Sequence, residues 1–215
     1  ILFFKDKKQR NCPVRVLTYI DGNMYAKSKI NNEIEKSFGR VLALQSIQLQ
    51  SFINNAAIRK FDWDPSNIKW TKKFINLFSG YNKEIIKDAI NQHDKFVNKN
   101  IKNLKYSVTH GDPNDYNVFV KKNKIIGLID FGDSIYAPSI NDLAIALSYA
   151  LMNSKNFYQS LKNIVGIYNN VYPITSDEIY SLLGLIKSRL VITLVMAAKQ
   201  RKKYPDNKYL SISEN

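Results

Sequence analysis

Two short acidic motifs near the middle of the chain constrain its fold more than any other feature. The first is His110-Gly111-Asp112, followed five positions after the aspartate by Asn117, and the second is Asp130-Phe131-Gly132-Asp133. Between them, two apolar runs separated by the polar link Lys121–Lys124 are predicted to form a strand hairpin. Because a hairpin brings its two ends together, Asn117 and Asp130 are predicted to lie within reach of one ligand.

These residue types suit phosphoryl transfer from a nucleotide, which requires positioning of the triphosphate and neutralisation of its charge more than covalent chemistry. Asp112 is predicted to accept the proton of the acceptor hydroxyl, or to orient that hydroxyl. Asn117 and Asp130 offer one neutral and one charged oxygen ligand, which suits Mg²⁺. Either motif alone is more often an ordinary turn. The two in this order around a hairpin indicate a kinase-like phosphotransferase that uses Mg²⁺ with ATP or GTP.

A protein kinase is the nearest alternative. It has the same spacing from aspartate to asparagine, but it carries an arginine at the position of Gly111, and its D-F-G motif precedes a long activation segment that ends in A-P-E. Here only twelve positions separate Asp130 from Asp142, where the next helix is predicted to begin. This leaves no room for a peptide-docking segment, so a small-molecule acceptor is favoured.

The stretches HGDPNDYNVFV and GLIDFGDS resemble the aminoglycoside phosphotransferase and choline kinase superfamily, whose members share the protein-kinase-like fold. Within it, the chain resembles the hydroxylysine kinase group, including the phosphotransferase domains fused to class III aminotransferase-like domains. The softer stretches that carry this second resemblance are Val14 to Gly22, Phe38 to Phe52, Asn141 to Met152 and Pro205 to Glu214. The resemblance therefore covers nearly the whole chain.

The resemblance implies an α+β fold in which the nucleotide lies between a strand-rich N-lobe and a helical C-lobe. It implies that the base contacts the backbone at the hinge, near Leu17, Thr18 and Tyr19. It also implies that His110 and Asp142 support the catalytic loop, Asp142 by hydrogen bonding. Asp142 has a simpler alternative role as a favourable charge at a helix N-terminus.

The acceptor that the resemblance implies is a small amine-bearing molecule with a hydroxyl. A hydroxylysine-like amino alcohol is the first candidate, and aminoglycosides, choline or ethanolamine, and homoserine are others. Asp115 and Asp133 are candidates to meet the substrate amine, and the alternative for each is an ordinary solvated loop carboxylate. Trp63 and Trp70 are expected either to pack in the core or to border the acceptor pocket.

Residues 1–22 are predicted to be the last strands of the N-lobe and the hinge, and residues 23–215 to be the helical C-lobe. The predicted strands are Ile1–Lys5, Val14–Ile20, Tyr106–Thr109, Asn117–Val120 and Ile125–Ile129. The predicted helices span 30–52, 72–105, 141–152, 156–169, 176–185 and 187–203.

The glycine-rich loop and the strand lysine that hold the phosphates in kinases are missing ahead of the motifs, and the chain begins with Ile. We therefore expect a fragment or a truncated gene product, with an upstream N-lobe and a downstream aminotransferase-like domain as candidate neighbours. The alternative is a catalytically weak kinase-like remnant that acts as a binding module. An apolar surface is expected to stay exposed near residues 1–4 and 16–19.

The net charge of +14 raises the alternative of a nucleic-acid or membrane partner. The lysines are scattered, with one dense cluster at 199–203, so a composition bias with a phosphate-binding cleft is favoured and no specific nucleic acid is expected. The longest apolar run, Leu190–Ala198, is too short to span a membrane. A single cysteine, Cys12, fits a reducing compartment. These features predict a cytoplasmic protein without a membrane partner.

Overall fold

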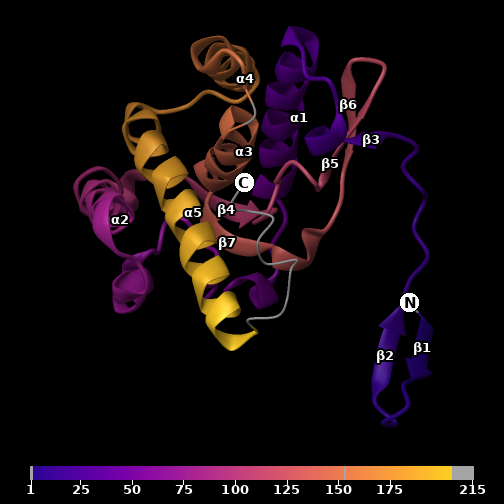
Figure 1. Ribbon diagram of the computed structural model, residues 1–215. Helices are drawn as coiled ribbons and strands as arrows, with labels where there is room; N and C mark the ends of the chain where they lie inside the picture. Colours follow the sequence, from indigo (N-terminus) through magenta and orange to yellow (C-terminus); the bar gives the residue numbers. More distant parts are fainter. Residues whose placement is uncertain (1, 153, 205–215) are drawn as a thin grey trace.

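The computed structural model describes residues 2–152 and 154–204 and has an α+β architecture, with a helical body, small antiparallel sheets and a separate N-terminal hairpin (Figure 1). Ile1, the first residue of a predicted strand, lies outside the described residues. So does Pro205 to Glu214, one of the stretches that resemble the hydroxylysine kinase group. The division of the chain into the last N-lobe strands with the hinge (1–22) and a helical C-lobe (23–215) stays a prediction.

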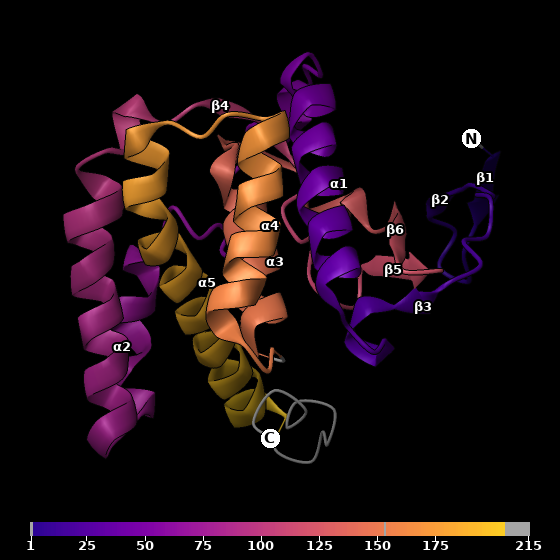
Figure 2. The same ribbon diagram turned by 90° about the horizontal axis from the view of Figure 1, so that it is seen from above.

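The N-terminal hairpin consists of β1 (Leu2–Lys5) and β2 (Asn11–Val14), which pair antiparallel from Leu2 opposite Val14 to Lys5 opposite Asn11. Seven of the eight strand residues are exposed, and the hairpin stands beside the helical body in both views (Figures 1 and 2). The prediction of a strand over Val14–Ile20 was wrong. The Asp6 carboxylate accepts hydrogen bonds from the amides of Lys8 and Arg10 at 2.8 and 2.9 Å, so the turn is short and β2 begins three residues earlier than expected.

The predicted central hairpin is confirmed as β5 (Val118–Lys121) and β6 (Lys124–Leu128), to which β3 (Asn23–Met24) adds a third strand. The connecting residues Lys122 and Asn123 have positive φ of 47° and 59°, as a tight two-residue hairpin turn requires.

The strand that leads into the first motif is β4 (Tyr106–Thr109), as predicted. It pairs antiparallel with β7 (Ile135–Pro138), a strand that the sequence analysis did not predict.

Three helices match the predicted segments closely: α1 (Asn32–Gln50), α3 (Ile140–Met152) and α4 (Phe157–Val171). The α1 helix begins where the side chain of Asn31 accepts a hydrogen bond from the amide of Ile34 at 3.0 Å, which is ordinary N-terminal capping. Helix α1 packs mainly on α4, and α3 packs mainly on α5 (Ser176–Lys203) (Figure 2).

Two helix predictions were wrong. The segments 176–185 and 187–203 form one continuous helix, α5 (Ser176–Lys203), which begins at a capping box formed by Thr175 and Glu178. No proline interrupts it, and Gly184 gives space to Val97, whose side chain would lie 2.9 Å from a Cβ at that position.

The predicted helix over 72–105 is instead a series of shorter pieces. They are η3 (a 3-10 helix, Lys69–Leu77), α2 (Gly80–His93), η4 (a π-helical turn, Asp94–Asn98) and η5 (a 3-10 helix, Ile101–Asn103). The first break is at Phe78, which is extended, and Gly80, which has φ of 52°. Glycine adopts that conformation at little cost.

The core is divided between two clusters. The larger one lies among α1, α3, α4, α5 and the central hairpin, and the smaller one lies among α2, η3 and α5. By length and apolar composition α5 could cross a membrane, but 56% of its most apolar window is buried inside the fold. Its contacts with α2 and α3 account for its apolar character as a core helix.

Candidate active site

The first motif forms the loop between β4 and β5, directly after the buried end of β4 at Thr109. Gly111 has φ of 85°, and a Cβ at this position would lie 2.3 Å from the carbonyl oxygen of Asp133. Any side chain here would therefore collide with the second motif. This contact explains why a glycine stands where protein kinases have an arginine, and it brings the two motifs together.

Asp112 lies on this loop with donors on both carboxylate oxygens. Its Oδ1 accepts a hydrogen bond from Nη2 of Arg189 at 2.5 Å, and its Oδ2 accepts one from Nδ2 of Asn114 at 2.8 Å. The side chain is 19% exposed, so the carboxylate stays accessible from one side. Burial raises the pKa of Asp112, the Arg189 guanidinium opposes that rise, and the carboxylate of Asp133 adds to it.

Asn117 and Asp130 are brought together at the open end of the central hairpin, as predicted. The amide of Ile129 donates to the carbonyl of Asn117 at 3.0 Å, which places Asp130 beside this pairing. Asn117 donates from Nδ2 to the carbonyl of Asp112 at 2.9 Å, so its Oδ1 is the atom available to a metal. Asp130 has the left-handed conformation (φ 67°, ψ 60°) and is exposed.

This donor set fits Mg²⁺, which is commonly held by one or two protein carboxylates together with substrate phosphates and water. Among residues 2–152 and 154–204, no group of three or more histidine, cysteine, aspartate or glutamate side chains could hold a metal without such help. The two predicted ligands therefore suit a metal that arrives with a nucleotide. Their role as ligands stays a prediction.

His110 and Asp142 are both buried under the catalytic loop. The two oxygens of Asp142 accept hydrogen bonds from the amide of His110 at 2.7 Å and the amide of Gly111 at 3.0 Å, and Oδ2 also accepts one from Nε2 of Gln45 at 2.7 Å. The imidazole Nε2 of His110 is 2.9 Å from the carbonyl of Ile129. These contacts connect α3, α1 and the exit of β6 to the loop that carries Asp112.

The two candidate contacts for a substrate amine differ in their surroundings. Asp115 is only 7% exposed, its carbonyl accepts a hydrogen bond from the amide of Ala26, and burial raises its pKa. Asp133 is half-buried at the end of η6 (Phe131–Asp133) and lies against Gly111. It is close enough to Asp112 for its carboxylate to raise the pKa of Asp112. Asp133 is therefore a partly exposed carboxylate close to Asp112, whereas Asp115 is mostly enclosed.

The predicted nucleotide-binding residues Leu17, Thr18 and Tyr19 are exposed and have no regular secondary structure. The next residue, Ile20, packs closely on β6, since a Cβ at Gly127 would lie 2.6 Å from its Cδ1. The predicted hinge therefore leads directly to the central hairpin, which Ile20 reaches at Gly127, three residues before Asp130.

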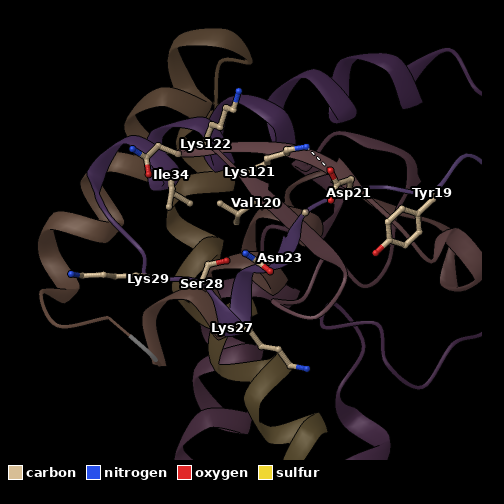
Figure 3. A pocket seen from close by; sticks show the side chains of 12 residues that line it. Tyr19, Asp21, Asn23, Lys27, Ser28, Lys29, Ile34, Val120, Lys121 and Lys122 are labelled. Carbon is tan, nitrogen blue, oxygen red and sulfur yellow. Dashed lines mark hydrogen bonds and ion pairs between the residues drawn. The ribbon is translucent and has the colours of Figure 1, made fainter.

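A cleft of about 540 Å³ lies at the tip of the central hairpin, between the predicted hinge and the start of α1 (Figure 3). An ion pair between Lys121 and Asp21 at 2.6 Å lies along it, and Tyr19 borders it. Its lining does not include Asp112, Asn117 or Asp130. This cleft is separate from the residues gathered at the open end of the hairpin.

Arg189 is the site residue that the sequence analysis missed. It lies on α5, 77 positions after Asp112, and its side chain is only 3% exposed. Its guanidinium carbon is 4.7 Å from the ring of Trp63 and 5.6 Å from the ring of Tyr149. One signal was available, because Arg189 is a charged residue among the apolar positions Leu185 and Ile192 on the buried face of a helix, where an unpaired charge would be costly.

Two acidic loops at the open end of one hairpin, set in a mostly helical lobe, are the arrangement expected of the catalytic lobe of a protein-kinase-like phosphotransferase. The Phosphotransferase enzyme family matches residues 2–164 of the chain. The chain therefore belongs to that family, which confirms both the resemblance to aminoglycoside phosphotransferases and the predicted fold class.

Known proteins similar to this chain include small-molecule kinases. Hydroxylysine kinase of Mus musculus is 30% identical in an alignment of 215 residues. This alignment covers 93% of this chain and 57% of the mouse protein. A microcompartment-associated aminopropanol kinase superposes with a TM-score of 0.69 at 15% identity, over 98% of this chain and 70% of that one. The amicoumacin kinase hAmiN, solved with AMP-PNP, Ca²⁺ and Ami, superposes with a TM-score of 0.61 at 13% identity, over 85% of this chain and 56% of that one. The chain thus spans just over half the length of the mouse relative.

Proposed function

We propose that the full-length protein transfers the γ-phosphate of ATP or GTP to a hydroxyl of a small amine-bearing molecule, with a hydroxylysine-like amino alcohol as the first candidate. The observation that carries this proposal is the gathering of Asp112, Asn117 and Asp130 at the open end of one hairpin. Family membership supports the reaction class. The names of the hydroxylysine kinase and aminopropanol kinase relatives support an amino alcohol acceptor.

In the proposed reaction, Asp112 orients the acceptor hydroxyl and receives its proton as the new oxygen–phosphorus bond forms and the bond to the nucleoside diphosphate breaks. Each oxygen of Asp112 already accepts a hydrogen bond, so a remaining lone pair is left for the hydroxyl. Asn117 and Asp130 would hold Mg²⁺, which when bound neutralises charge on the phosphates. His110 and Asp142 would keep the loop in place through the backbone contacts described above.

The acceptor amine is assigned to Asp133 rather than Asp115. A half-buried carboxylate beside Asp112 can meet an ammonium group that arrives with the hydroxyl, whereas the Asp115 side chain is enclosed. Aminoglycosides, choline or ethanolamine, and homoserine are the other acceptors to test.

The proposed location of the protein is the cytoplasm.

A binding module is the second candidate function, and the exposed N-terminal hairpin favours it. Leu2, Phe3 and Phe4 are 59 to 67% exposed, and Val16 and Leu17 are 95% and 71% exposed. Such an apolar surface is unusual on a monomeric soluble protein, and an upstream N-lobe is the partner proposed for it in the full protein. A downstream aminotransferase-like domain is a further proposed neighbour. If the chain alone is the functional form, self-association and weak catalysis are expected.

The test is a screen of amino alcohols with ATP and GTP, using the full-length gene product and following phosphorylated acceptor by mass spectrometry. Two matched controls accompany hydroxylysine: lysine, which lacks the hydroxyl, and 2-amino-5-hydroxyhexanoate, which lacks the terminal amine. We expect turnover with hydroxylysine or another amino alcohol, none with lysine, and weaker turnover without the amine. Absence of phosphorylation across the whole panel, with nucleotide and Mg²⁺ present, would support the binding module instead.

A further inference from the structure

Arg59 is an exposed arginine that lies beside the second acidic motif, although it is far from that motif in the sequence. Its Nη2 donates hydrogen bonds to the carbonyl oxygens of Gly132 and Ser134, at 3.1 and 3.3 Å. These two residues flank Asp133, the carboxylate assigned above to the acceptor amine. A cation and an anion are therefore carried on the two sides of one short turn.

The contacts of Arg59 hold its guanidinium without neutralising it. Of its five N–H donors, only those of Nη2 have hydrogen-bond acceptors within residues 2–152 and 154–204. The guanidinium carbon lies 4.9 Å from the centre of the Phe61 ring, which supports the side chain but carries no net charge. Within the described residues, neither Arg59 nor Asp133 forms an ion pair. Both charges are therefore left for a ligand.

The segment that carries Arg59 continues along the catalytic loop. Four residues later, the carbonyl of Trp63 accepts a hydrogen bond from Arg189 at 3.2 Å, and Arg189 also donates to Asp112. Asp133 is close enough to Asp112 for the two carboxylates to interact. The free cation, the carboxylate assigned to the amine and the residue assigned to the hydroxyl thus belong to one connected part of the site.

This combination of charges matches an acceptor that is itself an amino acid. Hydroxylysine carries its hydroxyl and its terminal amine on neighbouring carbons at one end, and a carboxylate at the other end. When Asp112 meets the hydroxyl and Asp133 meets the terminal amine, Arg59 is the cation available to the carboxylate. Guanidinium groups suit this task, because their N–H donors and their permanent charge act on a carboxylate together.

We propose that Arg59 binds the carboxylate of the acceptor and so selects amino acids with a side-chain hydroxyl over simple amino alcohols. The identity of this ligand as a phosphate acceptor rests on the proposed function, but the carboxylate contact does not. The proposal divides the candidate acceptors, because hydroxylysine and homoserine carry a carboxylate, whereas choline, ethanolamine and aminoglycosides do not. The phosphates of the nucleotide are the other anion within the proposed reaction, and the experiment separates the two.

The experiment compares hydroxylysine with 1,5-diaminopentan-2-ol, which differs from it only in lacking the carboxylate. Wild type, Arg59→Gln, Arg59→Lys and Arg40→Gln are prepared in the full-length gene product. Arg40 is an exposed arginine on α1, so its removal changes the net charge equally. Calorimetry gives the Kd of each acceptor in the presence of Mg²⁺ and the diphosphate of the preferred nucleotide, and separately the Kd of that Mg²⁺-nucleotide. Phosphorylation of both acceptors is then followed with the triphosphate.

We expect wild type to bind hydroxylysine more tightly than 1,5-diaminopentan-2-ol. Arg59→Gln should weaken the binding of hydroxylysine by about tenfold or more, because a hydrogen bond to a charged group is lost, and should leave the binding of 1,5-diaminopentan-2-ol nearly unchanged. Arg59→Lys should keep part of the preference, because the charge remains. Arg40→Gln should change neither Kd, and the Kd of the Mg²⁺-nucleotide should be similar in all four proteins.

Several results would overturn the inference. Equal losses for both acceptors in Arg59→Gln would show that Arg59 only holds the turn, and a loss of nucleotide affinity alone would assign it to the phosphates. Phosphorylation of amino alcohols by a wild-type protein that does not prefer the carboxylate would overturn the inference and leave the proposed function standing. Binding that depends on the carboxylate and on Arg59, without phosphorylation of either acceptor, would support the inference and contradict the proposed function. A wild-type protein that binds neither acceptor would overturn both.

Discussion

Replacement of Asp142 by asparagine separates the two roles that the sequence allows for this residue. Asparagine has nearly the same shape but only one acceptor oxygen. In the wild-type protein the amides of His110 and Gly111 donate to different oxygens of Asp142. Whichever way the new amide is turned, one buried backbone N–H therefore loses its acceptor.

The size of the effect follows from these contacts. A hydrogen bond to a charged group contributes about 1.5–3 kcal/mol, and a buried donor left without a partner costs about 1–3 kcal/mol. Relief from burying the charge offsets part of this, so we expect Asp142→Asn to lower the free energy of unfolding by roughly 2–4 kcal/mol. For a domain of this size, that corresponds to a fall in Tm of about 4–16 °C.

Asp177→Asn provides the matched control, because Asp177 lies in the first turn of α5 as Asp142 lies in the first turn of α3. A helix N-terminal charge alone contributes about 0.3–1 kcal/mol. Urea unfolding of both variants gives the comparison, and turnover of Asp142→Asn is expected to fall as its loop loosens. Equal and small losses of stability in the two variants would refute the hydrogen-bonding role of Asp142.

Three further predictions concern the metal, the base and a buried histidine. Asp130→Ala should raise the Mg²⁺ concentration needed for nucleotide binding more than Asn117→Ala does, because it removes a charged ligand; Mg²⁺ titrations that coincide for both variants and wild type would disprove the assignment. The nucleotide base is predicted to contact backbone groups of residues 17–20, so Tyr19→Ala should change nucleotide affinity only moderately, and a nucleotide-bound structure with the base elsewhere would show that the hinge is misplaced. Burial lowers the pKa of His93 to about 4, against about 6.5 in an unfolded chain. Between these values the unfolded state binds a proton that the folded state does not, so the free energy of unfolding should fall by up to about 3 kcal/mol as pH drops from about 6.5 to 4. Denaturant unfolding across this range should show a smaller fall in His93→Gln, and an unchanged pH dependence would contradict the reasoning.

Local patterns in the sequence were sufficient for much of the site. The hairpin between the motifs is specified by two apolar runs and a polar turn, and its closure places Asn117 beside Asp130 without further information. The apolar periodicity of residues 30–52, which predicted α1, is likewise a local signal. Features of this kind depend on residues within a few positions of one another.

The features that were missed depend on contacts between distant residues. The strand β7 contains only four residues and ends in Pro138, so its pairing with β4 is needed to define it. The continuity of α5 depends on packing against α2 and α3. Arg189 meets Asp112 only because the tertiary fold brings α5 to the catalytic loop, and an arginine within an apolar helix does not identify its partner.

The role proposed for Asp112 in phosphoryl transfer can be tested with a single variant. Turnover with the best amino alcohol is measured for wild type and Asp112→Asn in the full-length gene product, alongside the Kd of the Mg²⁺-nucleotide. We expect turnover to fall by about 10²–10⁴-fold while the Kd stays nearly unchanged, because the role proposed for Asp112 is to act on the acceptor hydroxyl and not to hold the nucleotide. Wild-type turnover in a folded Asp112→Asn protein would contradict it.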